Sequence, residues 1–399
     1  MLSERQLENY ADVLWWGLAT ARRNPYRRGD VVQIRFQAGA LRLAEILHRL
    51  LLRRGLHPIP RLLPTPDMEL GFYTLATGRQ LDFVSPGEEP LLRRLNGSIV
   101  LSAPDSLTHL RAADPGKIGR AALATKPLKN LLETRESRGD YSWTLCMLPT
   151  AELARTAGMR ATAYADQIAR ACFLDAASPV AEWRRVYRTA GRIRQRLDRL
   201  GAVRYRVESA GTDLEIAAGA QRSWAGVSGR NIPSFEIFVS PDWRGTRGVF
   251  YADQPSYRSG NIVRGVRLEF RDGRVVRARA AEGEAFLRRQ IAMDRGAAQV
   301  GEFSLTDRRL SPIDRFMANT LFDENFGGAQ GNAHIALGSS YANTYAGDRR
   351  RLTRARKSAL GFNDSALHWD FVNTERKRVT AVMGDGSRTT IYEDGEFRI

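Results

Sequence analysis

The hydrophobic pattern of this chain changes near Gly201, and this change limits the folds that it can adopt. Before that point, strand-like segments alternate with helix-like segments. The strand-like segments are 30–37, 58–63, 96–103 and 143–148, and the helix-like ones are 41–54, 165–174 and 180–200. Strands that alternate with helices are typical of a parallel sheet. Residues 1–200 are therefore predicted to form an α/β domain with a parallel sheet.

After Gly201, short alternating segments separated by glycine and Asp-Gly turns dominate the sequence. Asp272-Gly273 stands between two alternating runs, which is a strong hairpin signal. One helical segment, 283–296, interrupts the strands. Residues 201–399 are therefore predicted to form a β-rich α+β domain, with the boundary expected within 195–205. Two domains also suit a chain of 399 residues, which is long for one ordinary core.

The formal net charge of +17 has two interpretations. It can attract polyanions or acidic substrates, or it can be a solvated surface without a specific partner. The arginines are spread along the chain, which favours the second interpretation. One dense group, called here the basic cluster, consists of Arg349, Arg350, Arg351, Arg354, Arg356 and Lys357. The sequence has no zinc-finger spacing, RNP aromatic motif or GxxxxGK[ST] loop, so no specific nucleic-acid partner is expected.

The sequence favours a cytoplasmic location and no membrane segment. No stretch approaches the roughly 20 apolar residues that would span a bilayer. Ser3 and Gln6 have the spacing of a capping box, so the N-terminal segment is interpreted as a folded helix and not as a signal peptide. Cys146 and Cys172 lie in apolar surroundings, which suits free buried thiols in a reducing compartment.

A short apolar run near the end of the chain, SALHWDFV, carries a histidine and an aspartate. If it is a strand, His368 and Asp370 share one face, while Leu367, Trp369 and Phe371 share the other. The bulky face is predicted to enter the core. The face with His368 and Asp370 can then bind a ligand.

Three further runs have the same character. Glu236 in SFEIFV and Glu302 in GEFSL point away from apolar neighbours, and His334 begins the small-residue strand HIALG. With His368 and Asp370 they supply two imidazoles and three carboxylates, which is the ligand set of a hydrolytic site with two metal ions. Taken singly, each could be a solvated carboxylate or a buried core histidine, so the interpretation depends on the whole set. Such mixed ligands suit Zn, Co or Mn.

At these motifs the sequence resembles the thermophilic aminopeptidase family, the aminopeptidase T-like metallopeptidases of bacteria. The resemblance covers the second half of the chain, from GTDL at 211–214 through NIPSFEIF, VGEFSL, TLFDEN, HIALG and HWD. It implies a homodimer that encloses its active sites in a chamber and admits short peptides. It also implies two divalent metal ions per chain, held by Glu236, Glu302, His334, His368 and Asp370.

The resemblance further implies roles for single side chains. Tyr341, seven residues after His334, matches the active-site tyrosine of the family and would donate a hydrogen bond to the oxyanion of the tetrahedral intermediate. Glu302 would bridge the two metals and could also shuttle the proton of the attacking water. Glu324 in LFDENF is a candidate for the group that holds the terminal ammonium of the substrate. The alternative for Glu324 is an ordinary carboxylate at a helix end or in a loop.

Two features depart from the family pattern. Phe235 precedes the first glutamate where a small residue is usual, so a bulky side chain could alter the substrate pocket. The stretch at 325–334 is longer than in the shorter family form, so substrate preference is not carried over. The basic cluster, between Tyr341 and His368, could reach the entrance of the site and attract a peptide carboxylate.

These observations favour a metallo-aminopeptidase that trims N-terminal residues from oligopeptides. One alternative is a ring-cleaving dioxygenase of dihydroxypyridine, which uses a single Fe(II) in a related site. The presence of both Glu236 and Glu302 favours two metals over this alternative. A second alternative, suggested only by the charge, is a non-catalytic polyanion binder, which would have no use for a complete ligand set.

Overall fold

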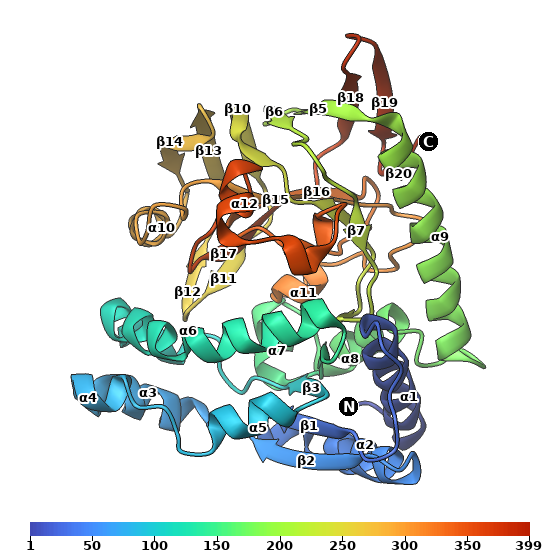
Figure 1. Ribbon diagram of the computed structural model, residues 1–399, viewed down its shortest axis with the longest axis vertical. Coiled ribbons are helices and arrows are strands. Elements are labelled where there is room, and N and C mark those ends of the chain that lie inside the picture. Colours follow the sequence, from blue (N-terminus) through green and yellow to red (C-terminus); the bar gives the residue numbers. More distant parts are fainter. The chain divides into compact units, whose positions relative to one another are not determined.

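The computed structural model describes residues 1–399, and the chain divides into two compact units (Figure 1). The first comprises Met1–Trp183 and Ser228–Pro233, and the second comprises Arg184–Val227 and Ser234–Ile399. The division falls inside helix α9 (Pro179–Leu200). The hydrophobic pattern of the sequence changes only where this helix ends. Nothing in that pattern indicates that Ser228–Pro233 belongs to the first unit.

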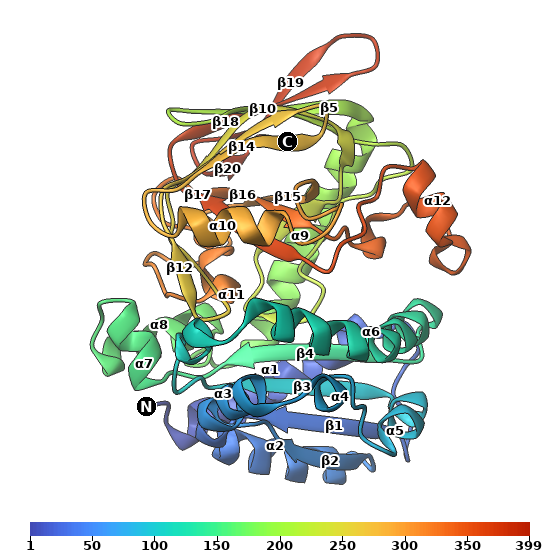
Figure 2. The ribbon, with the colours of Figure 1, turned by 90° about the vertical axis from the view of Figure 1, so that its left-hand side faces the viewer.

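The first unit contains a five-stranded parallel sheet with the order β2-β1-β3-β4-β8. Figure 2 shows β2, β1, β3 and β4 side by side in this order. The strands are β1 (Val31–Phe36), β2 (His57–Leu62), β3 (Gly97–Ser102), β4 (Ser142–Met147) and β8 (Asn231–Ile232). The first four occupy the segments predicted from the sequence, so the parallel sheet is confirmed, and β8 joins from much later in the chain.

Helices connect and flank these strands. They are α1 (Glu4–Ala21), α2 (Leu41–Arg53), α3 (Pro66–Leu75), α4 (Gly78–Leu81), α5 (Glu88–Arg94), α6 (Pro115–Arg138), α7 (Ala151–Thr156) and α8 (Ala161–Ala171), with the 3-10 turns η1 (Ala38–Ala40) and η2 (His109–Ala112). The predicted capping box is present, because the Ser3 amide donates to Gln6 and the Gln6 amide donates to Ser3 Oγ. The long helix α6 was not predicted: Pro127 lies inside it, and its leucines Leu128, Leu131 and Leu132 are only partly buried against the neighbouring core.

The second unit contains two antiparallel sheets. The larger has the order β14-β13-β10-β6-β5-β18-β19-β20, and the smaller has the order β17-β16-β15-β9-β7. The larger consists of β5 (Ala202–Ser209), β6 (Asp213–Ala217), β10 (Asp242–Ala252), β13 (Val266–Arg271), β14 (Arg274–Arg279), β18 (Lys377–Met383), β19 (Arg388–Glu393) and β20 (Glu396–Phe397). The smaller consists of β7 (Ala225–Gly226), β9 (Glu236–Val239), β15 (Val300–Thr306), β16 (Asn332–Gly338) and β17 (His368–Asn373).

A separate hairpin and a few short helices complete this unit. They are β11 (Ser256–Arg258), β12 (Asn261–Val263), α10 (Glu284–Ile291), α11 (Thr320–Asp323), α12 (Arg354–Ala359), η3 (Ala342–Thr344) and η4 (Arg349–Arg351). The predicted fold class, a parallel α/β part followed by a β-rich α+β part, is confirmed.

Two local predictions in this unit have different outcomes. Asp272 and Gly273 form the two-residue loop between β13 and β14, with φ angles of 48° and 76°, as a type I′ turn requires. A Cβ at Gly273 would lie 2.2 Å from the carbonyl oxygen of Trp243, so glycine is needed there. The helix predicted at 283–296 is shorter, because α10 ends before Asp294, whose carboxylate accepts backbone N–H groups of the following turn.

The core of the second unit lies between its two sheets. The ring of Phe303 on β15 contacts those of Tyr205 on β5 and Trp224, with centroids 5.8 Å and 5.9 Å away. Phe303 is fully buried. Because neighbouring residues of a strand point to opposite faces, Glu302 and Ser304 lie on the other side of β15. The small sheet therefore has one face in the core and one face that carries polar side chains.

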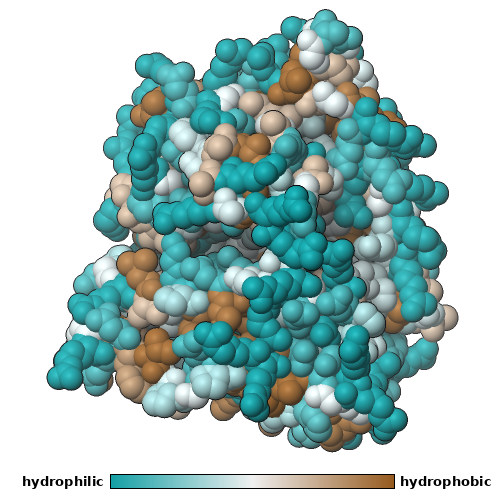
Figure 3. All heavy atoms as spheres, in the orientation of Figure 1, coloured by the Kyte–Doolittle hydropathy of each residue, from teal (hydrophilic) through white to brown (hydrophobic).

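One face of the molecule is mainly hydrophilic (Figure 3). Figure 3 shows hydrophilic residues over most of one face, with hydrophobic residues in small patches. No helix combines the length and the apolar character needed to cross a membrane. Cys146 and Cys172 are buried and free, as their apolar surroundings predict.

Candidate metal centre

The five predicted metal ligands lie on one face of the small sheet. In its register, Glu302 is opposite Ala336, and Ala336 is opposite Asp370 on the next strand. Ser304 is likewise opposite His334. Directly paired residues, and residues two apart on a strand, share a face of the sheet. This register therefore aligns the strands that carry the set Glu236, Glu302, His334, His368 and Asp370.

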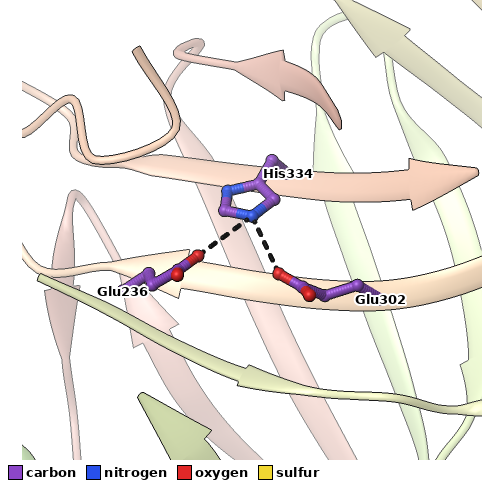
Figure 4. Close-up of side chains that lie close together, drawn as sticks. All are labelled: Glu236, Glu302 and His334. Atoms are coloured by element: carbon purple, nitrogen blue, oxygen red, sulfur yellow. Dashed lines mark hydrogen bonds and ion pairs between the residues drawn. The ribbon is translucent and has the colours of Figure 1, made fainter. Parts of the chain in front are cut away.

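The first three ligands converge on one point. His334 Nε2 lies 3.3 Å from Glu236 Oε2 and 3.2 Å from Glu302 Oε1 (Figure 4). The sequence had suggested that His334 begins its strand, but it is the third residue of β16. Each of the three residues can offer a ligand atom to the same metal ion. They come from three neighbouring strands, so the rigid sheet holds their separation.

The other two predicted ligands adjoin this group. His368 Nε2 lies 3.5 Å from Asp370 Oδ1 and 3.9 Å from Glu302 Oε2. The two oxygens of Glu302 thus face different imidazoles, one toward His334 and one toward His368. The structure therefore brings all five residues together around Glu302.

Burial and charge show that the cluster suits a cation. Glu302 is 3% exposed, and its desolvation together with the negative charge of Glu236 raises its pKa to about 7. Desolvation opposes the charge on His368, but the charge and hydrogen bond of Asp370 prevail and raise the pKa of the imidazole to about 9. Buried carboxylates side by side repel one another unless a positive charge lies between them. Carboxylate and imidazole donors in this arrangement fit divalent Zn, Co or Mn.

Both histidines are oriented to use the same nitrogen. His334 Nδ1 lies 3.4 Å from Asn332 Oδ1, and His368 Nδ1 lies 2.9 Å from the carbonyl oxygen of Ser339. The amide nitrogen of Asn332 donates to the carbonyl oxygens of Glu324 and Phe326, so its oxygen is the atom that faces the ring. With Nδ1–H donating to these acceptors, each Nε2 keeps its lone pair for a metal.

Small side chains separate the ligands on this face. Ala336 is fully buried and stands between Glu302 and Asp370 in the register of the sheet. Ser304 stands beside His334, and its hydroxyl lies 3.5 Å from Glu236 Oε2. Both side chains are short, so neither reaches far above the sheet among the five predicted ligands.

Tyr341 lies beside the cluster. The centroid of its ring is 4.7 Å from that of His368 and 5.8 Å from that of Phe238. Its backbone N–H donates to Ser240 Oγ at 2.8 Å, and 43% of the residue is exposed. Phe238 lies two residues after Glu236 and shares the ligand face of β9. Strand alternation predicts this position when the bounds of β9 are known.

Glu324 also belongs to this neighbourhood. It caps the C-terminus of α11 and is 7% exposed. Desolvation, together with the charges of Glu236 and Asp370, raises the pKa of Glu324 well above its usual range. The next residue, Asn325, accepts the backbone N–H groups of Phe235 and Glu236 through its side-chain oxygen. Asn325 therefore anchors the start of β9, a role that the sequence did not indicate.

The bulky residue before the first glutamate does not enter the ligand face. Phe235 is fully buried, and alternation along the strand directs it away from Glu236. The expected change in the substrate pocket stays a prediction.

The basic cluster lies in η4 and α12, on the segment between Tyr341 and His368. Its side chains are mostly exposed, and Arg350 pairs with Asp348 at 2.9 Å. A cavity of about 380 Å³ beside it is lined by Gln221, Tyr345, Ala346, Gly347, Asp348, Arg351 and Arg356. None of the five predicted ligands lines this cavity.

Comparison with known proteins identifies the family. Residues 3–397 match the family model of thermophilic metalloproteases, M29. The chain belongs to this family. The resemblance noted in the second half is confirmed, and the match extends it to the first half, which carries no diagnostic motif.

Individual relatives are aminopeptidases by name. The chain is 32% identical over 208 residues to Aminopeptidase AmpS of Bacillus subtilis, covering 49% of each protein. It is 25% identical over 347 residues to Aminopeptidase PepS of Streptococcus thermophilus, covering 78% of this chain and 81% of that protein. The match thus spans about half of the Bacillus protein and most of the Streptococcus one.

A solved structure shows the same fold. Wild-type AmpT from Thermus thermophilus superposes with a TM-score of 0.81 at 23% identity, covering 99% of this chain and 100% of that chain. Membership in a metalloprotease family implies a divalent metal, and the donor set around Glu302 fits one. The count and identity of the ions are part of the proposal below.

Proposed function

We propose that this chain is a metal-dependent aminopeptidase that removes N-terminal residues from short peptides with a water molecule activated by two divalent cations. Two such cations would polarise the scissile carbonyl and lower the pKa of a shared water. The proposal rests on the family and on the arrangement of the five residues around Glu302.

The orientation of Glu302 carries the two-metal part of the proposal. Its oxygens lie 3.2 Å from His334 Nε2 and 3.9 Å from His368 Nε2. Each imidazole also has a carboxylate of its own, Glu236 at 3.3 Å and Asp370 at 3.5 Å. Two ligand sets that share one carboxylate are what a two-metal site requires. In this assignment Glu302 would hold both ions, and its carboxylate would also be available as a base for the proton of the water.

Tyr341 is proposed to donate a hydrogen bond to the oxygen of the scissile carbonyl. Its ring contacts His368, and its backbone is held by Ser240, so the side chain starts from a fixed point next to the ligands. A donor that is placed before the reaction stabilises a developing oxyanion far better than one that must be ordered first.

Glu324 is proposed to receive the terminal ammonium of the peptide. Its carboxyl is buried among Glu236 and Asp370, whose charges raise its pKa. An ammonium group placed there would compensate these negative charges and favour the ionised form of Glu324. This interaction would explain why the enzyme acts at the free amino end of a peptide.

The test combines metal analysis with product analysis. Protein reconstituted with Zn, Co or Mn should hold two ions per chain and release N-terminal residues from aminoacyl-p-nitroanilides and from di- to pentapeptides. N-acetylated peptides of the same sequence are the matched control and should resist cleavage, because they lack the ammonium. Glu302→Gln should lose metal and activity together.

Two other results would support the alternative functions. A single oxygen-sensitive iron per chain would support the ring-cleaving dioxygenase. Tight binding of DNA or RNA at physiological salt, with no peptidase activity in added metal, would support the polyanion binder.

The homodimer, the cytoplasmic location and the natural substrates belong to the same proposal. Sedimentation of the purified protein tests the dimer directly. A dimeric chamber would also reject folded proteins, so a folded substrate with an accessible N-terminus should remain uncut while its short N-terminal peptide is hydrolysed.

A further inference from the structure

Two of the proposed ligands lie on a strand with a neighbour on one side only. β17, which carries His368 and Asp370, is the edge strand of the small sheet. His334 and Glu302, in contrast, lie on β16 and β15, which are hydrogen-bonded to strands on both sides. An edge strand has outward-facing backbone groups that need other partners.

The outer edge of β17 is paired by an unusual set of donors. The Gln254 backbone N–H donates to the carbonyl oxygen of Val372 at 3.3 Å. Ser256 Oγ donates to the carbonyl oxygen of Asp370 at 3.4 Å. Arg258 Nη1 donates to the carbonyl oxygen of His368 at 2.8 Å.

These three contacts form a regular antiparallel series. The donor positions rise by two residues while the acceptor positions fall by two, as across a pair of strands. Only the first contact uses a backbone donor. At the second and third positions, the side chains of Ser256 and Arg258 replace the backbone N–H groups of a neighbouring strand.

Both side chains are themselves held in place. Trp369 Nε1 donates to Ser256 Oγ at 2.8 Å, and the guanidinium of Arg258 lies 5.7 Å from the centre of the Trp369 ring. Arg258 Nε also lies 3.4 Å from Gln290 Oε1 on α10. The Arg258 donor thus has a defined position at the carbonyl of His368, and the contact is not that of a freely moving surface arginine.

We propose that Arg258, assisted by Ser256, is a positioning residue that sets the location of His368 and Asp370 and thereby the occupancy of the metal position that these two residues form. The inference rests on the ligand assignment of the proposed function. It adds that the two metal positions have unequal support. His334 lies on a strand with backbone ladders on both sides, and Glu236 is held by the ladder to β15 and by Asn325. The strand of His368 and Asp370 has a ladder only to β16, and at these two residues its outer edge depends on the side chains of Ser256 and Arg258.

The experiment measures metal content in the full-length protein. Wild type and the variants Arg258→Met, Arg258→Lys and Ser256→Ala are loaded with Zn and dialysed against graded chelator, and the ions per chain are counted by elemental analysis. Arg264→Met is the matched control, because Arg264 lies after the same hairpin and its exposed side chain pairs with Glu282.

We expect Arg258→Met to lose one ion at a chelator concentration at which wild type and Arg264→Met keep both. Loss of an outer partner of a metal ligand commonly lowers metal affinity by roughly 10–100-fold. The ion at the His368 and Asp370 position should show this change, while the ion at the Glu236 and His334 position should not. Arg258→Lys keeps the charge but not the fork of donors, so it should restore affinity only in part. Ser256→Ala should weaken the same ion by a smaller factor, and it keeps the inference testable if Arg258→Met does not fold.

The outcomes separate this inference from the proposed function. Two ions held by Arg258→Met and Ser256→Ala with wild-type affinity would overturn the positioning role and leave the proposed function standing. Equal weakening of both ions would also overturn it, since the arginine would then support the fold in general. A wild-type protein that never binds two ions would refute the two-metal function itself.

Discussion

Removal of metal should reverse the way in which this protein's stability responds to pH. In the folded chain the pKa of Glu302 is about 7, against 4.5 for an unperturbed glutamate. Between these values the unfolded chain has lost the proton and the folded chain still holds it. Because the folded state binds more protons, the free energy of unfolding of metal-depleted protein falls as the pH rises through this window.

The size of the effect follows from the same two values. The difference between a pKa of 4.5 and one of about 7 corresponds to about 3 kcal/mol for a group as buried as Glu302. His368 acts in the same direction at higher pH. Its raised pKa of about 9 gives stability that is present below 6.5 and is lost as the pH approaches 9. The lowered pKa of Asp370 stabilises the fold above about pH 4 and is lost only below it.

Metal-loaded protein should behave in the opposite way. The ions must displace protons from these ligands, so metal affinity rises with pH. The difference in melting temperature between loaded and chelated protein should therefore widen from pH 5 to pH 8. For a domain of 150–250 residues, 1 kcal/mol corresponds to roughly 2–4 °C, so Glu302 alone should contribute roughly 6–12 °C.

The assay is thermal unfolding in chelator and in saturating metal at each pH. Buried groups outside the centre, such as Asp323 with its raised pKa of about 8, titrate in both samples and cancel in the difference. In chelator, Glu302→Gln should make the decline between pH 5 and 7 shallower by the contribution of Glu302, while the parts due to Glu324 and Asp323 remain. A constant difference between loaded and chelated wild type across this range would refute the reasoning.

Four further tests concern the ligand face, two proposed substrate contacts and the basic cluster. Ala336→Leu should put a side chain into the space among the ligands, cost about 1–3 kcal/mol of stability and prevent metal binding, as melting curves and elemental analysis would show; retention of both ions would contradict the placement of the metals. Tyr341→Phe should lower kcat by roughly 10²–10³-fold with both metals retained, and an unchanged kcat would exclude its role at the oxyanion. Glu324→Gln should raise KM for free peptides without loss of metal; an unchanged KM would remove it from substrate binding. Neutralising Arg349, Arg350 and Arg351 should weaken short-peptide turnover most at low salt, and rates that do not move would show that the basic cluster is only surface.

The face on which each ligand lies could be predicted from the sequence, because strand alternation is a local property. In HWDFV the large residues Trp369 and Phe371 are buried, as their spacing predicts, and His368 and Asp370 lie opposite them. The same rule places Glu302 and Phe303 on different faces of β15, and the ring of Phe303 packs against the large sheet. Alternation depends only on neighbours in the chain, so it predicts the face of each side chain without any knowledge of the fold.

Which ligands become neighbours could not be predicted in this way. Glu236 and His334 reach each other because β9 and β16 flank β15, and this order depends on how the small sheet packs as a whole. Only the composition of the whole ligand set and the family resemblance pointed to their convergence. Helix α6 was missed although Asp114 and Gly139 are typical of a helix start and end, because Pro127 lies inside it and its leucines are only partly buried.

The residues that contact the proposed ligands also differ in whether the sequence predicts them. Asn332 shares a strand face with His334, two positions away, so alternation finds it once β16 is known to begin there. The partners of β17 follow no such rule, because Arg258 reaches the carbonyl of His368 from a hairpin that is separate from the ligand sheet. His334 has both a local partner and backbone ladders on both sides of its strand. His368 and Asp370 depend at the outer edge of β17 on side chains of a distant segment, so we expect substitutions there to change metal occupancy while every proposed ligand remains in the sequence.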